Sequence, residues 1–291
     1  MTSMAGVAGQ QQLVSRPKLH VPWNFVLAYV VLAIAAVIFA LPFFWLVTTA
    51  FKPDEQIFAF PPHWIPNPII FDQFTKGLAE YPFGRFFLNS LTVSLLAAFG
   101  VVISSSLAAY GLSRIDWPGR NVLFALILGT ILLPFQVRLI PLFLTYNALN
   151  WIDTLLPLFV PFFFGNAFAI FLLRQFFRGI PQDLSDAARM DGANEWQIYW
   201  RIFLPLARPA VATVALLTFV ERWDDYLGPL IFITSRENAT VSLGLSLFRG
   251  QYGNSWGQLM AVSTVAVIPI IVLFFFAQRT FIQGITLTGI K

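Results

Sequence analysis

Uncharged, apolar stretches of membrane-spanning length alternate with shorter polar connectors along the chain. The first stretch, residues 25–51, carries no charged side chain and would be roughly 40 Å long as a helix. Similar stretches follow at 86–112, 121–146, 155–173, from 210 onward, and 257–278. The pattern predicts an all-α integral membrane protein with six transmembrane helices in one domain, residues 23–282, between tails at 1–22 and 283–291.

Charged residues interrupt two of these stretches. Arg138 lies in the third, and "ERWDD" at 221–225 breaks the fifth before it resumes at Tyr226. An ionisable side chain at the bilayer centre costs a few kcal/mol on insertion scales, so these groups are expected to face protein or water. One interpretation is a solute pathway, because polar and aromatic side chains within spans can line a route for a solute through the bilayer. The alternative is an ion-pair network that holds kinked helices together. The candidate pathway residues are Gln136, Arg138, Asn166, Trp223, Asp224, Asp225 and Tyr226.

Composition narrows the functional class. Apolar residues make up 57% of the chain and the mean hydropathy is +0.72, so a lipid environment is expected. Cysteine is absent, the two His residues have no metal-ligand spacing, and no G-x-x-x-x-G-K-[ST] phosphate-binding loop occurs. The basic residues are spread along the chain, which gives no sign of nucleic-acid binding. We expect a non-catalytic membrane protein that binds no metal or cofactor itself.

The distribution of Lys and Arg predicts that both chain ends are cytoplasmic. With the amino terminus inside, eleven basic residues lie on the cytoplasmic side and six on the outer side, with Arg138 uncounted. The longest inner loop is then 174–208, between the fourth and fifth helices. The longest outer segment runs from Lys52 to Tyr81, and its Pro-rich sequence is expected to form either a docking surface or an inert rigid loop.

The inner loop has the local signals of two short helices. Pro181 and Asp183 favour a helix start, and Gly192 accepts the left-handed conformation that ends a helix. Asn194 can cap a second helix with Gln197, and Leu204-Pro205 is expected to close that helix. Its residues allow a docking role, because the small side chains of 187–188 permit close approach and Asp186 can meet a basic group. An ordinary interfacial connector with an apolar underside explains the periodicity equally well.

The spacing within this loop resembles the signature of permease subunits of ATP-binding-cassette importers. That signature is Glu-Ala-Ala, three residues, Gly, nine residues, Ile, any residue, Leu-Pro. The chain matches every spacing, with Asp in place of Glu at the first position, which keeps the charge and shortens its reach. The matching residues are Asp186, Ala187, Ala188, Gly192, Ile202, Leu204 and Pro205, and Asp191 lies among them.

Further stretches narrow the resemblance to the second permease of carbohydrate importers, similar to that of the maltose system. They are "AAYGLSRIDWPGR", "FLLRQFFRGIPQDLSDAARMDGA", "RWDDYLGPLIF", "GQYGNSWGQLMA" and "QRTFIQGITLTGIK". The resemblance implies a type I importer permease fold in the inner membrane of a prokaryote. It also implies a homologous second permease, two cytoplasmic ATPase subunits that bind ATP and Mg²⁺, and an extracytoplasmic sugar-binding protein. Residues 183–193 would then be the coupling helix.

Other transport classes remain open at this stage. Relatives of this subunit also carry glycerol phosphate, so a non-sugar solute is an alternative cargo. An ion-coupled secondary transporter would explain the acidic pair Asp224-Asp225, but it would not need the 174–208 loop and would more often show two related halves. A requirement for ATP and for a co-purifying ATPase distinguishes these classes.

Overall fold

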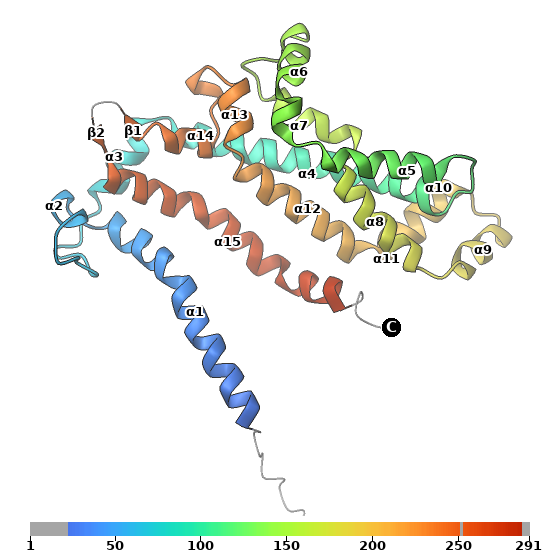
Figure 1. Ribbon diagram of the computed structural model, residues 1–291, viewed down its shortest axis with the longest axis horizontal. Coiled ribbons are helices and arrows are strands. Elements are labelled where there is room, and N and C mark those ends of the chain that lie inside the picture. Colours follow the sequence, from blue (N-terminus) through green and yellow to red (C-terminus); the bar gives the residue numbers. More distant parts are fainter. Residues whose placement is uncertain (1–22, 251–252, 287–291) are drawn as a thin grey trace, which may run out of the picture. The chain divides into compact units, whose positions relative to one another are not determined.

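The computed structural model describes residues 23–250 and 253–286 (Figure 1). The tail expected at 1–22 and the last five residues of the tail expected at 283–291 lie outside these ranges. Among the described residues, four helical stretches are long and apolar enough to cross a membrane, and two bent helix pairs bring this number to six if each pair is one span. The predicted all-helical class is confirmed, apart from a two-residue antiparallel pair, β1 (Arg249–Gly250) with β2 (Gly253–Asn254).

The chain divides into two compact units, residues 1–45 and 46–291. Most of α1 (Trp23–Ala50) belongs to the first unit, and an 18-residue window within its residues 25–50 has a mean hydropathy of 2.8. This helix corresponds to the first expected span. The remaining elements belong to the second unit.

The core of the second unit is built on α4 (Phe83–Ser113), which packs along α12 (Arg208–Trp223) and α8 (Ala167–Gly179). Its buried face is rich in Ser, Ala and Gly, residues that let helices approach closely. At Gly100 a Cβ atom would lie 2.5 Å from Cδ2 of Phe163, so only glycine fits beneath that ring.

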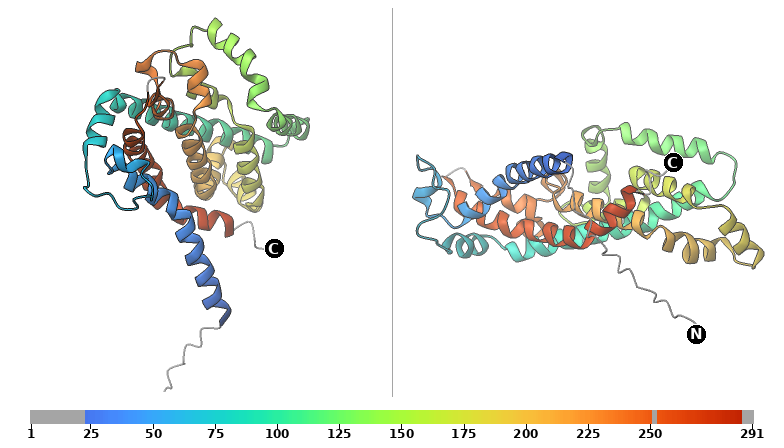
Figure 2. Two further views of the ribbon diagram at one scale, coloured as in Figure 1. Left: turned by 60° about the vertical axis from the view of Figure 1, so that its left-hand side comes forward. Right: turned by 90° about the horizontal axis from the view of Figure 1, so that it is seen from below.

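Two short helices lie in the connecting segment that follows α1. The segment between Lys52 and Tyr81 contains α2 (Asp54–Ile57) and α3 (Asp72–Glu80), and the Pro-rich stretch between them is not helical, as predicted. Both pack against α15 (Trp256–Thr286), which continues beyond the expected boundary at 282. The view from below in Figure 2 shows α2 and α3 at one end of the unit and the 174–208 loop at the opposite end.

The third expected span is bent, which differs from the single run predicted at 121–146. The chain forms α5 (Arg120–Gly129) and a 3₁₀ turn (Thr130–Leu132), then turns by 99° into α6 (Phe135–Ala148). Leu133 is extended, with φ −82° and ψ 107°. A residue that precedes proline is disfavoured in the helical region, so the Leu133-Pro134 pair ends the first helix.

The fourth expected span is also irregular. Residues 155–173 were expected to form one helix, but the chain forms α7 (Leu156–Phe159) and a 3₁₀ helix (Val160–Phe164) before α8 begins. Gly165 separates them with φ +100°, and the Oδ1 atom of Asn166 accepts the Ala169 N–H at 3.0 Å as the N-cap of α8.

The fifth span breaks where "ERWDD" predicted. Here α12 ends at Trp223, and α13 (Leu227–Phe232) begins after three residues. A 3₁₀ turn (Arg236–Asn238) and α14 (Val241–Ser246) then lead to the β pair. Two buried clusters lie along α4, one with α8, α12 and the 174–208 loop, and the other with α12, α14 and α15.

Candidate functional site

The first helix that lies wholly within the 174–208 loop is α9 (Asp183–Met190). Both ends of this short helix match the sequence prediction. Acidic residues lie in its first turn and Arg189 in its last turn, which complements the helix dipole. Gly192 has φ +82°, and the Ala193 N–H donates to the carbonyl of Ala188 at 2.9 Å. This six-to-one hydrogen bond is the Schellman arrangement, in which the left-handed residue is usually glycine.

The second half of the loop starts as predicted and continues differently. Asn194 and Gln197 form a capping box with both hydrogen bonds at 2.9 Å at the start of α10 (Glu195–Ile198). A π-helical turn (Tyr199–Phe203) and α11 (Leu204–Leu206) follow. The expectation that Leu204-Pro205 ends the helix is wrong, because Pro205 lies in the first turn of α11, where its missing N–H costs little. The break comes at Ala207, and the helices on its two sides are bent by 76°.

One face of the loop is exposed and the other is buried. Ile198 is fully buried, and Ala188, Ile202 and Leu204 pack against the same cluster. In contrast, Ala187, Asp191 and Gly192 are exposed, and no atom lies within 4 Å of the position a Cβ would take at Gly192. Met190 is 87% exposed. The loop therefore presents an exposed surface of small, apolar and acidic residues on a helix whose other side is packed against the bundle.

Ion pairs within the loop engage the acidic signature residue. Arg189 donates to Asp186 and to Glu195, both at 2.9 Å. Burial raises the pKa of Glu195, but hydrogen bonds from Tyr110 and Arg189 outweigh this, and the pKa lies below its ordinary value. The sequence analysis missed Arg189, although its position three residues after Asp186 on a helix is a signal for such a pair.

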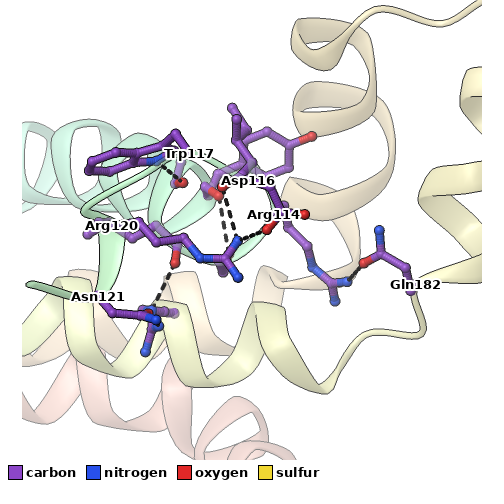
Figure 3. A network of polar contacts seen from close by, with 12 residues as sticks. Arg114, Asp116, Trp117, Arg120, Asn121 and Gln182 are labelled. Carbon is purple, nitrogen blue, oxygen red and sulfur yellow. Dashed lines mark hydrogen bonds and ion pairs between the residues drawn. The ribbon is translucent and has the colours of Figure 1, made fainter.

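Arginines at the neighbouring helix ends surround the start of this loop (Figure 3). Arg114, at the end of α4, donates to Oε1 of Gln182 at 2.6 Å. Arg174 donates to the carbonyl of Leu112 at 3.0 Å, and its guanidinium lies 3.9 Å from the ring centre of Phe124. The last carbonyl groups of a helix have no partner within the helix. Arg174 and Arg114 donate to such carbonyls at the ends of α4 and α8, respectively.

A cavity of about 490 Å³ lies between α6, the α7–α8 segment and the α12–α13 break. Four of the predicted pathway residues line it, together with Glu221, Arg222 and several apolar side chains. The residues that line it and carry polar groups are Gln136, Arg138, Tyr146, Asn166, Glu221, Arg222 and Asp225. Arg138 and Asp225, which lie in different expected spans, thus line the same cavity.

Arg222 is the centre of the charged cluster in this wall. It pairs with Asp225 at 2.9 Å and Glu221 at 2.5 Å, and its guanidinium lies 4.8 Å from the ring centre of Phe162. The other carboxylate oxygen of Asp225 accepts the N–H of Gly228 at 3.1 Å. Both interpretations of the sequence therefore have a counterpart, since this ion-pair network joins α12 to α13 and also lines a cavity.

Three of the predicted pathway residues do not line the cavity. Trp223 is 2% exposed and donates through Nε1 to the carbonyl of Ala266 at 3.2 Å, so it packs α12 against α15. Asp224 and Tyr226 are exposed outside the cavity. Neighbouring residues at a helix end point in different directions, so only Asp225 of residues 223–226 lies on this cavity wall.

Metal-binding side chains do not gather within the described parts of the chain, where no group of three or more His, Cys, Asp or Glu residues is found. Two features thus form the candidate site: the exposed 174–208 loop at one end of the bundle, and a polar cavity among interrupted helices.

The fold resembles that of a solved importer. The crystal structure of a bacterial ABC transporter involved in the import of the acidic polysaccharide alginate has a chain that matches with a TM-score of 0.78 and 24% identity, over 88% of this chain and 96% of that one. At this identity the match establishes the fold alone, and it confirms the predicted importer-permease architecture.

Two curated relatives cover nearly the whole chain. The arabinooligosaccharides transport system permease protein AraQ of Bacillus subtilis (strain 168) is 34% identical over 88% of this chain and 92% of the relative. The sn-glycerol-3-phosphate transport system permease protein UgpE of Yersinia pestis bv. Antiqua (strain Antiqua) is 31% identical over 89% and 95%.

The family model for the binding-protein-dependent transport system inner membrane component matches residues 100–287, which include the whole 174–208 loop and the cavity. The resemblance drawn from the signature spacing at 186–205 is thereby confirmed. The chain belongs to the family of inner membrane components of binding-protein-dependent transport systems.

Proposed function

We propose that this chain is the transmembrane permease subunit of an ATP-driven sugar importer. It forms half of a translocation pathway that opens alternately to the two sides of the membrane. The family match over 100–287, which includes a loop that exposes Ala187, Asp191 and Gly192 on an anchored helix, is the observation that carries this proposal.

The complex around this subunit follows from the same family. A homologous second permease completes the pathway. Two ATP-binding-cassette subunits, which themselves bind ATP and Mg²⁺, dock at the 174–208 loop, and an extracytoplasmic binding protein delivers the sugar. This chain has six spans in the inner membrane with both termini in the cytoplasm, an orientation supported by the eleven basic residues on the inner side. ATP hydrolysis takes place in the partner subunits.

The cavity supports a neutral, hydroxyl-rich cargo. Its lining holds two arginines, Arg138 and Arg222, and two carboxylates, Glu221 and Asp225, so their formal charges cancel. A charged solute would bring an uncompensated charge into a region of low dielectric, whereas a sugar hydroxyl both donates and accepts hydrogen bonds. The rings of Phe162 and its neighbours on the wall offer apolar surface to sugar CH groups.

Glycerol phosphate is the second candidate cargo. UgpE, named for that solute, is 31% identical to this chain, and the guanidinium of Arg138 is exposed on the cavity wall, where it can meet a phosphate. Arg222, in contrast, is committed to two carboxylates.

ATP hydrolysis by the complete complex in lipid vesicles tests the proposal. Arabino-oligosaccharides, lactose, an oligouronate and glycerol phosphate would each be presented on the binding protein. Stimulation by a neutral oligosaccharide supports the sugar importer, and stimulation by glycerol phosphate alone replaces it with the second candidate. A complex that binds no ATPase at all would contradict both.

A further inference from the structure

One face of α4 carries three polar side chains at helical spacing next to the 174–208 loop. Ser106, Tyr110 and Arg114 are separated by four residues each, so their side chains lie one above another. All three residues are buried, with exposures of 0%, 4% and 8%. Buried polar groups in a span require specific partners, and here those partners belong to the loop.

Arg114 holds the start of the loop. Its guanidinium donates to Oε1 of Gln182 at 2.6 Å and to the carbonyls of Phe177 and Ile180. These carbonyls belong to the last turn and C-cap of α8, which carry the negative end of the helix dipole. The same guanidinium lies 4.7 Å from the ring centre of Phe203, in the returning half of the loop.

Tyr110 and Ser106 hold the returning half. The Tyr110 hydroxyl donates to Glu195 at 2.7 Å, and its ring meets those of Tyr199 and Phe203 edge to face. The hydroxyl groups of Ser106 and Tyr199 are hydrogen-bonded at 2.8 Å. The segments that flank α9 on both sides are therefore tied to α4, and Arg189 of α9 is paired in turn with Glu195. The loop is not joined to α4 directly by the chain.

The covalent connections of the loop to its neighbouring helices are both interrupted by breaks in helical structure. On one side, the non-helical residues 180–182 separate α8 from α9. On the other side, the break at Ala207 separates α11 from α12 with a bend of 76°. A push on α9 can be absorbed at either break, whereas the contacts to α4 bypass both.

The opposite end of α4 is tied to another connecting segment. Asn89 donates to the carbonyls of Glu237 and Ala239 at 2.8 and 2.9 Å, and the hydroxyl of Ser90 accepts the N–H of Val241 at 2.8 Å. Between these ends α4 is a single helix of 31 residues without proline, about 45 Å long at 1.5 Å per residue. A displacement at one end would thus reach the other.

We propose that Ser106, Tyr110 and Arg114 are positioning residues that lock α9 to α4. The two helices then move as one body when the ATPase subunits act on the loop, and α4 carries that movement to residues 237–241. This inference rests on the proposed function, because it requires an ATPase that acts on α9.

The absence of cysteine from the chain makes a direct test practical. Spin labels are attached to Ile103→Cys on α4 and Leu184→Cys on α9, both exposed positions that lie outside the exposed surface at 187–192. The complete complex is reconstituted in vesicles with partner subunits that lack reactive cysteines. The distance distribution between the labels is measured without nucleotide and after trapping with ATP and vanadate.

In the labelled parent, the distance is expected to remain unchanged between the two states. With Arg114→Gln, which removes the donors to three acceptors, trapping is expected to shift or broaden the distribution. Arg114→Lys retains the charge without the planar fork and should fall between them. Tyr110→Phe removes only a hydroxyl, so it tests the same lock with little risk to folding.

Arg120→Gln is the matched control, because Arg120 lies nearby but donates to Asp116 and to the carbonyl of Ile115, outside the loop (Figure 3). It should behave like the parent. A large change of distance in the parent, or Arg114→Gln and Tyr110→Phe distributions that stay at the parent value, would overturn the inference. A parent complex that cannot be trapped with ATP would instead count against the proposed function.

Discussion

Gly192 offers a graded test of the geometry of the 174–208 loop. Its φ of +82° lies in the left-handed region, and the space beside its Cα is open, so a substitution acts through backbone strain alone. For alanine that strain amounts to about 1–2 kcal/mol. Asparagine tolerates this conformation better, and proline, with φ fixed near −65°, cannot adopt it.

The strain sets the expected loss of ATPase binding. If the turn relaxes to relieve it, the docking conformation of α9 becomes less populated, and the apparent affinity falls by the same factor. For Gly192→Ala that factor is at most about 5- to 30-fold. Gly192→Asn should lose less, and Gly192→Pro should abolish binding and transport while the protein still inserts into the membrane.

The assay is binding of the purified ATPase subunits to the permease pair in nanodiscs. Gly179→Ala is the matched control, because Gly179 ends a helix without a positive φ and has no atom within 4 Å of the Cβ position, so its affinity should stay at the parent value. Equal affinities for Gly192→Ala and Gly192→Pro, or weaker binding by the Asn variant than by the Ala variant, would refute the argument from backbone strain.

Three other perturbations follow from the structure. Gly100→Ala places a methyl group 2.5 Å from the ring of Phe163, so overpacking should lower the free energy of unfolding by about 1–3 kcal/mol, measurable as a lower Tm. The lowered pKa of Glu195 means that its stabilising contribution is complete above the ordinary value of 4.5 and is lost as pH falls through the folded-state pKa; Glu195→Gln should therefore flatten the decrease of Tm in that acidic range. Asp225→Asn removes the ion pair with Arg222 but keeps an oxygen for the N–H of Gly228, so sugar-dependent stimulation of ATP hydrolysis should change while ATPase binding does not; unchanged substrate kinetics would return Asp225 to a structural role.

Local signals predicted the loop well, because its turns depend on neighbouring residues. Gly192 and the Asn194–Gln197 pair each specify a conformation within four positions, and the structure contains both. Pro134 was among the prolines for which the sequence allowed either a kink or ordinary packing. The split of this span into two helices was not predicted, because apolar residues on both sides gave a single uninterrupted stretch. A hydropathy pattern shows how long and how apolar a stretch is, but it does not show whether the helix axis changes direction within that stretch.

Contacts across long separations were beyond the sequence. Tyr110 and Glu195 are 85 residues apart, and Arg114 and Gln182 are 68 apart, so no spacing rule joins them. Four of the seven candidate pathway residues line the cavity, and the sequence could identify them for a physical reason. Polar groups within apolar spans are energetically unfavourable in lipid, so they face water or other protein groups. Trp223 was expected near a solute pathway, but it does not line the cavity. Its indole N–H donates to the carbonyl of Ala266 in the packing of α12 against α15.

The stoichiometry of ATPase subunits that co-purify with the permease pair tests the central claim most directly. The pair should retain two ATP-binding-cassette subunits, and Ala187→Glu, which places a charge on the exposed face of α9, should retain none while still inserting into the membrane. A parent pair that binds no ATPase, or an Ala187→Glu variant that binds the full complement, would contradict the assignment of this loop as the surface through which ATP hydrolysis drives transport.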